Sequence, residues 1–226
     1  MRQTRERHDK IMDVSDAHFS VLLDLPGWTL VWAELTVDPA SPAAHAVLRE
    51  TIEKARARHG AQLSADDPTV AAIRKLFRAA GCDPTRYRPS SEALLRRVLK
   101  SEDLAAIQPL VDLNNALSID LAVPSCIMAA DSMEPPLVLR AGAPGETFES
   151  LRGPFSLEGK PLLADAKGPL GTPITDSVRV KIQSDTAHGW LVAYLPKDAV
   201  FAGEAERTLR DLAARAGVEV GRVFAV

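Results

Sequence analysis

The sequence predicts an α+β fold, and two observations lead to that prediction. Amphipathic helical patterns fill most of residues 42–121, whereas prolines and glycines recur every few residues from Ala122 onward and separate short β-prone runs. Further β-prone runs stand near the start and at the end of the chain. Helices first and strands later, with strands also at both ends, are typical of helices flanking a mixed sheet. We expect that sheet to be largely antiparallel.

The first elements follow from local patterns. Residues 1–13 are polar, and we expect them to fray. Apolar side chains crowd the run TLVWAELTV around Trp28–Val37, which predicts a mostly buried strand. Residues 42–58 carry a helical apolar stripe, with Pro42 in the first turn and Gly60 after the last residue, so this stretch is predicted to be a helix.

Three more helices are predicted before residue 122. One runs from Pro68 to Ala80, with Asp67 as its N-cap residue. The next begins at Ser90 or Ser91, either of which is a good N-cap residue. The fourth begins near Pro109.

The second half reads as strands and one helix. The β-prone runs are LVLRA, LLAD, VRVKI and WLVAYLP. An amphipathic helix is predicted over residues 204–216, followed by the short strand VEVGRVFAV. With 226 residues and no internal repeat, we expect a single domain over 1–226.

Composition narrows the functional classes. The chain is 46% hydrophobic and 25% charged, which predicts a packed core. A net charge of −3 argues against tight, sequence-blind nucleic-acid binding, so we expect no DNA partner, while a local patch could still dock RNA. No run approaches the ~20 apolar residues of a membrane span, and no signal peptide is evident at the start. We therefore expect a cytoplasmic protein with no membrane association, whose two cysteines, Cys82 and Cys126, are free thiols.

One predicted helix carries an unusual set of polar side chains. Their spacings of three and four residues place them on adjoining helix faces beside an apolar stripe. They are Asp112, Asn114, Asn115 and Ser118. The functional interpretation is a hydrogen-bonding wall of a pocket, and the alternative is a solvated face.

Several motifs occur in the order found in a known family. They are DPTRYRPSSEALLRR (residues 83–97), VDLNN (111–115), Pro124, LRAGAPGETF (139–148) and LLAD (162–165). Over about residues 70–195 the chain resembles the B3/B4 editing domain of the phenylalanyl-tRNA synthetase β subunit, in its free-standing form. The resemblance implies an editing factor that hydrolyses the ester of a mischarged aminoacyl-tRNA, without a cofactor and without the rest of a synthetase. The alternative is a non-catalytic module that binds an amino acid or an RNA end.

The chain departs from the family pattern inside the expected pocket. Asn114 stands where the family has Thr, Asn115 matches the family's Asn, and Cys126 occupies the place of a His. A thiol is mostly protonated at neutral pH and cannot replace the hydrogen bonds of an imidazole. Cys126 is either a nucleophile with a lowered pKa or, as we expect, a small buried side chain that shapes the pocket.

A loop rich in glycine and hydroxyls, GPLGTPITDS over residues 168–177, stands where the family has a glycine-rich loop. We expect a catalytic role for Asn114, Asn115, Thr172 and Thr175, in orienting water and stabilising an oxyanion. Substrate contacts are expected from Asp112, Ser118, Cys126, Asp176, Ser177 and Thr186. The pocket should lie between the helix 111–118, the segment 124–128 and this loop, although an ordinary hairpin connection is the alternative for the loop.

Two further groups of residues have competing interpretations. Five cationic side chains lie within fifteen residues: Arg86, Arg88, Arg96, Arg97 and Lys100. They form either a phosphate-binding patch for a tRNA end or a solvated helix face whose charge is balanced by Glu92 and Glu102. Arg140 and Glu146 fit the family's RxA…GE motif but equally suit an ion pair that braces a turn, and Asp165 suits a turn after a strand. No His or Cys shares metal-ligand spacing with another, so we expect no metal.

Overall fold

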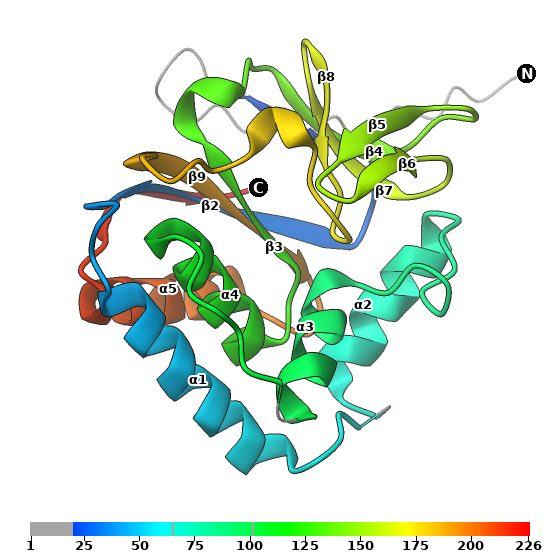
Figure 1. Cartoon of the computed structure of the whole chain (residues 1–226). Helices are drawn as coiled ribbons and strands as arrows, with labels where there is room; N and C mark the ends of the chain where they lie inside the picture. Colours follow the sequence, from blue (N-terminus) through cyan, green and yellow to red (C-terminus); the bar gives the residue numbers. More distant parts are fainter. Residues whose placement is uncertain (1–19, 65, 101) are drawn as a thin grey trace, which may run out of the picture.

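The computed structural model describes residues 20–64, 66–100 and 102–226, so the polar start, residues 1–13, lies outside the described residues (Figure 1). The α+β class is confirmed, with helices grouped in the first half and most strands in the second. The helices are α1 (Ala43–His59), α2 (Pro68–Ala79), α3 (Ser90–Leu99), α4 (Pro109–Leu121) and α5 (Ala202–Ala216), with short 3₁₀ helices η1 (Ala130–Ser132) and η2 (Val178–Val180).

The strands form two four-stranded sheets and a hairpin. The first sheet has the order β10-β2-β9-β3 and is antiparallel throughout. The second has the order β1-β4-β7-β8 and is mixed, because β1 pairs with β4 in parallel. The strands of the first sheet are β2 (Trp28–Thr36), β3 (Ser125–Ala129), β9 (His188–Pro196) and β10 (Glu219–Ala225). The others are β1 (Val21–Leu23), β4 (Leu137–Ala141), β7 (Pro161–Asp165) and β8 (Gly168–Gly171), with β5 (Thr147–Ser150) and β6 (Gly153–Ser156) in the hairpin.

The first sheet lies between two layers. Figure 1 shows α1, α4 and α5 on one side of β2 and β9, and the strands β4 to β8 on the other. A single buried cluster joins Leu113 of α4, Trp32 of β2 and Leu139 of β4, so one continuous core underlies both sheets. Gly189 of β9 lies close enough to α4 that an added Cβ would come within 3.2 Å of Leu110.

Most local expectations are confirmed, and two need correction. Asp67 caps α2 by accepting a hydrogen bond from the Val70 N–H at 3.0 Å. Neither Ser90 nor Ser91 caps α3, because Pro89 takes the N-cap position and no side chain supplies the bond. The run VRVKI is not a strand: its first three residues form η2.

Candidate functional site

Cys126 and Asp176 form the centre of the candidate site. Cys126 lies in β3, opposite Val192 of β9, and only 1% of it is exposed. Asp176 follows β8 and brings its carboxyl within hydrogen-bonding reach of the Cys126 thiol. Gly171 makes this position possible, because a Cβ added there would lie 2.8 Å from Asp176 Oδ1. The structure therefore brings the β3 segment and the loop after β8 together.

Asp176 and Cys126 each shift the pKa of the other, and the two shifts have opposite signs. Burial raises the pKa of Asp176 to about 6, while the hydrogen bond from Cys126 acts to lower it. Burial also raises the pKa of the Cys126 thiol well above its usual range, and the charge and hydrogen bond of Asp176 raise it further. The thiol is thus held protonated, which is the opposite of what an activated cysteine nucleophile requires.

Tyr194 adds a third polar group that sequence reasoning missed. Its side chain shares a face of the first sheet with Cys126, because Val192 and Tyr194 are two residues apart in β9. The residue is fully buried, and its hydroxyl has no hydrogen-bond partner within the part of the chain that the structure describes. Burial raises its pKa well above the usual value, and the nearby Cys126 and Asp176 raise it further. Only the register between β3 and β9 reveals this neighbour.

The loop from Thr172 to Ser177 is held largely by itself. The Thr172 hydroxyl donates to the Thr175 carbonyl at 3.0 Å and accepts the N–H groups of Ile174 and Thr175. Ser177 caps η2 by accepting the Arg179 N–H at 3.2 Å. The Pro173 carbonyl accepts the Ser90 N–H at 2.8 Å, which fixes the loop to the start of α3. The loop is rigid, but several of its backbone donors are already used.

The polar residues of α4 separate into different surroundings. Asp112 and Ser118 are buried, so the solvated-face interpretation does not hold for them. Asp112 faces His45 of α1 across 3.4 Å, and burial raises its pKa while the Ile107 N–H and His45 act to lower it. The Ser118 hydroxyl donates to the Val123 carbonyl at 2.8 Å. These two side chains therefore hold neighbouring elements together.

Asn114 and Asn115 lie nearer to β3. The Ser125 hydroxyl donates to the backbone carbonyl of Asn114 at 3.2 Å, so α4 and β3 are adjacent. Ser125 and Cys126 are consecutive in the strand, and their side chains point to opposite faces. The helix thus contacts the face opposite Cys126, at the edge of the sheet. Asn114 is buried with no hydrogen bond from any described residue to its Oδ1, whereas Asn115 is half-buried.

Thr186 lies in a turn before β9. Its hydroxyl accepts the Gln183 N–H at 2.9 Å, and its carbonyl accepts the Gln108 side chain at 2.7 Å. Gln108 is also the N-cap residue of α4. Thr186 therefore connects this turn to the start of α4.

The cationic segment is organised by a buried carboxylate. Glu92 is 1% exposed, and three guanidiniums surround it: Arg74 at 2.7 Å, Arg96 at 2.9 Å and Arg88 at 3.3 Å. Burial acts to raise the pKa of Glu92, but the hydrogen bonds and charges of Arg74 and Arg96 outweigh it and lower that pKa. Three cations on one anion leave two positive charges in excess. Glu92 is thus a buried anchor for these arginines, not part of a solvated face.

The remaining cations of the segment are less constrained. Arg97 pairs with Glu102 at 3.1 Å, and both side chains are about half exposed. The Arg86 guanidinium lies 5.1 Å from the centre of the Tyr87 ring. No ion pair joins Lys100 to another residue of the described chain.

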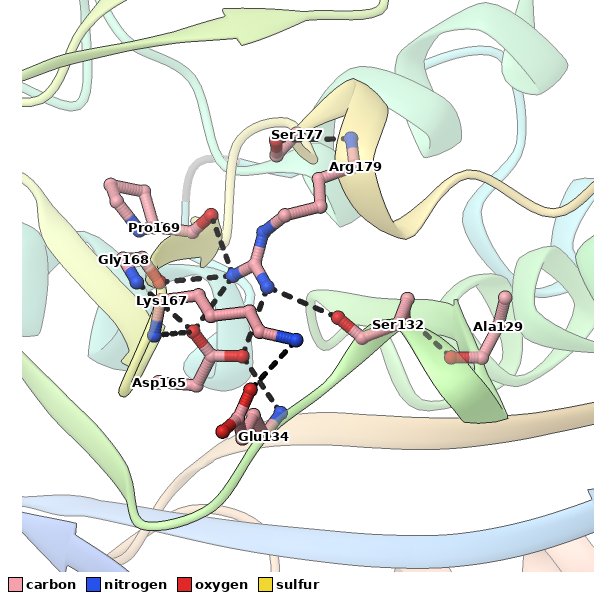
Figure 2. A network of polar contacts seen from close by, with 9 residues as sticks. All are labelled: Ala129, Ser132, Glu134, Asp165, Lys167, Gly168, Pro169, Ser177 and Arg179. Carbon is pink, nitrogen blue, oxygen red and sulfur yellow. Dashed lines mark hydrogen bonds and ion pairs between the residues drawn. The ribbon is translucent and has the colours of Figure 1, made fainter.

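Figure 2 shows a network of polar contacts centred on Arg179, which follows the loop Thr172–Ser177. Arg179 of η2 makes a two-pronged ion pair with Asp165 at 2.9 and 3.0 Å and also donates to the carbonyls of Ser132, Gly168 and Pro169. Burial acts to raise the pKa of Asp165, but the Arg179 bonds and the N–H groups of Glu134 and Lys167 outweigh it and lower that pKa. The network fastens η2, which directly follows the loop, to the turn between β7 and β8.

Arg140 and Asp165 both stabilise turns of the second sheet. Arg140 pairs with both oxygens of Glu146, at 2.6 and 2.8 Å, and the Ala143 N–H donates to the same carboxylate. The pair therefore braces the turn after β4. Asp165 ends β7 and accepts the N–H groups of Lys167 and Gly168 in the turn.

The described residues lack two kinds of feature. They contain no group of three or more His, Cys, Asp or Glu side chains placed to hold a metal ion. None of their helices combines the length and apolar character needed to cross a bilayer.

Comparisons with known proteins complete the description. No curated protein sequence matches the chain. Among solved structures, an N-terminal fragment of the phenylalanyl-tRNA synthetase β subunit from Pyrococcus horikoshii is similar, with 15% identity and a TM-score of 0.48 over 92% of this chain. The chain spans about half the length of that fragment, 52% of it. The sequence model of the B3/4 domain matches residues 72–215, which include α3, α4, Cys126 and Asp176, and the chain therefore belongs to the B3/4 domain family.

Proposed function

We propose that this protein hydrolyses the ester of a mischarged aminoacyl-tRNA. The observation that carries the proposal is the Cys126–Asp176 pair beside the unpartnered Tyr194 hydroxyl, within the family's matched region. Buried polar groups are normally hydrogen-bonded, so an orphaned hydroxyl next to a carboxyl of raised pKa is typical of a functional site. Membership of the B3/4 family, with the motifs that resemble a synthetase editing domain, motivates tRNA as the substrate class.

Asp176 is the general base in this mechanism. Its pKa of about 6 leaves it mostly ionised at neutral pH, yet basic enough to accept a proton from an attacking water. The water oxygen bonds to the ester carbonyl carbon and one water proton passes to Asp176. Asp176 then gives this proton to the ribose oxygen as the ester bond breaks, which restores the carboxylate. Because an aminoacyl ester is already activated, positioning and oxyanion stabilisation can supply most of the remaining acceleration.

Other side chains take supporting roles. Asn115 and Thr175 are half-buried, and no hydrogen bond of their side chains to another described residue competes with a ligand, so they serve as donors to the substrate. Asn114 is buried and holds α4 against the face of β3 opposite Cys126, so it is given no substrate contact. Cys126 shapes the pocket and directs the Asp176 carboxyl. Thr172 and Ser177 keep the loop rigid.

Arg88, just before α3, and Arg96 of α3 are proposed to bind the tRNA backbone. Arg88 and Arg96 approach Glu92 through Nε, which leaves their terminal nitrogens available to phosphate oxygens. Each side chain is about two-fifths exposed. The bond from Ser90 to Pro173 ties this helix to the loop that carries Asp176, so phosphate binding on α3 would deliver the 3′ end toward the same loop.

A non-catalytic module for an amino acid or an RNA end is the second candidate. The observation that favours it is that the N–H groups of Thr172, Ile174, Thr175 and Ser177 are bonded within the loop or to Leu170 of β8, so these four are not available to an oxyanion.

A deacylation assay over a panel of mischarged tRNAs tests the proposal. We expect selective release of one amino acid or a small group of them, with the matched correctly charged tRNAs left intact. Saturable binding of these tRNAs with no release above the buffer rate would favour the second candidate. Neither binding nor release would contradict both.

A further inference from the structure

A pocket lies away from the candidate site, between α1 and the segment that leads into α4. Its volume is about 230 Å³, and it is lined by His45, Arg49, Ile52, Glu53, Asp103 and Leu104. Drug-sized ligands occupy pockets of roughly 300–1,000 Å³, so this one suits a smaller molecule. It faces α1, whereas Cys126 points to the opposite side of the first sheet.

The imidazole in this pocket is oriented by a buried acid. His45 Nδ1 lies 3.4 Å from Oδ2 of Asp112, whose other oxygen accepts the Ile107 N–H at 3.3 Å. Nδ1 is buried, while 27% of the His45 side chain is exposed, so the exposed part lies away from Nδ1. Because Nε2 is on the far side of the ring from Nδ1, it is the nitrogen available to a ligand.

The pocket has a cationic end and an anionic end. His45, Arg49 and Glu53 are four residues apart in succession, so they occupy consecutive turns on one face of α1, at a pitch of about 5.4 Å. Arg49 has no ion pair with any residue that the structure describes. Glu53 and Asp103 share one guanidinium, that of Arg56, at 2.7 and 3.6 Å, which leaves one negative charge in excess. Ile52 and Leu104 supply apolar surface.

We propose that this pocket binds a free α-amino acid with a short aliphatic side chain. The carboxylate pairs with Arg49, the ammonium group with Glu53 and Asp103, and the side chain contacts Ile52 and Leu104. The two charges of the zwitterion are a few ångströms apart. With a hydrogen bond at each end, the ligand can bridge two side chains that are about one helical turn apart, as Arg49 and Glu53 are on α1. The site is independent of the proposed hydrolysis.

The test is calorimetric titration of the intact protein with L-valine, isobutyrate and isobutylamine. L-Valine should bind, and each analogue should bind at least about tenfold more weakly, because each lacks one of the two charges. Arg49→Met and Glu53→Gln should each weaken L-valine binding by at least about tenfold. Arg210→Met, which removes a half-exposed arginine paired with Glu206 on α5, is the matched control and should leave binding unchanged.

The controls separate this pocket from the candidate active site. Asp176→Asn should leave L-valine affinity unchanged, and the unfolding midpoints of Arg49→Met and Glu53→Gln should stay near the wild-type value because these side chains line a surface pocket. The proposal is overturned if L-valine does not bind, if isobutyrate binds as tightly, if both pocket variants retain wild-type affinity, or if Asp176→Asn abolishes binding.

Discussion

Replacing Asp176 by Asn should make the protein more stable at neutral pH. The pKa of this carboxyl is about 6 in the folded protein, whereas an unfolded aspartate has a pKa of about 3.9. A carboxyl whose folded pKa is raised binds protons more tightly in the folded state. The contribution of Asp176 to wild-type stability therefore falls as pH rises from about 4 through about 6 and changes no further above that.

The magnitude follows from the size of the shift. Two pKa units at 1.36 kcal/mol each correspond to about 3 kcal/mol, as an upper value for a carboxyl that is only partly buried as a residue. The amide introduced by Asp176→Asn would carry no charge and would still offer an oxygen to the Cys126 thiol, so this cost disappears in the variant. The advantage of the variant over wild type should be near zero at pH 4 and should approach its full value at pH 7.

Urea unfolding of both proteins at pH 4, 5, 6 and 7 measures this difference. Groups other than Asp176 titrate in both proteins, so the difference between them isolates one carboxyl. An advantage that is independent of pH, or a variant that is less stable at pH 7, would show that Asp176 is not held in the raised-pKa environment we describe. Asp198→Asn, at a position where the carboxyl is exposed, is the control and should change stability by less than about 0.5 kcal/mol.

Three further outcomes follow from the same contacts. Cys126→Ala should retain most deacylase activity, because a thiol with a raised pKa forms no covalent intermediate. A loss of several orders of magnitude, together with inactivation by thiol alkylation near pH 7, would instead show that Cys126 is a nucleophile. RNA affinity should fall steeply with added salt, and Arg96→Glu combined with Arg97→Glu should weaken it further; binding indifferent to both would place the RNA surface elsewhere. Arg179→Ala should lower the free energy of unfolding by about 3–5 kcal/mol, since it leaves the buried Asp165 unpaired, whereas the exposed Arg210→Ala should cost less than about 1 kcal/mol in the same denaturant titration.

The pH dependence of Asp165 has the opposite sign from that of Asp176. The folded pKa of Asp165 is lowered, so its stabilising contribution is present above the unfolded pKa of about 3.9 and is lost as pH falls through the folded pKa. Arg179→Ala should therefore differ most from wild type above about pH 5 and converge toward it in acid. A difference that persists unchanged in acid would mean that packing, not charge, accounts for the loss.

The sequence predicted the helices well because each carries its own local signals. The stripe of Leu110, Leu113 and Leu117 and the cap at Asp67 need no distant partner to be recognised. VRVKI was wrongly predicted to be a strand because of its alternating apolar and charged residues. That alternation gives no information on the ion pair between Arg179 and Asp165, which depends on tertiary structure.

The candidate site was predictable in outline and not in detail. Motif order placed Cys126 near the loop of Asp176, but only the pairing of β3 with β9 adds Tyr194 to them. The helix spacing grouped Asp112 with Asn115, yet the position of α1 directs Asp112 toward His45 instead. Long-range register and packing decide which polar side chains meet, and short spacings do not encode them.

The central claim, that Asp176 is the base in a hydrolytic site, is tested most directly by single-turnover deacylation of the preferred mischarged tRNA between pH 5 and 8. The wild-type rate should rise with pH and level off above a pKa near the value of about 6 that burial gives Asp176. Asp176→Asn should be slower by a factor of about 10²–10⁴ at the plateau, with its tRNA affinity unchanged. A variant that deacylates within a few fold of wild type, or a wild-type rate that does not change across this range, would contradict the account.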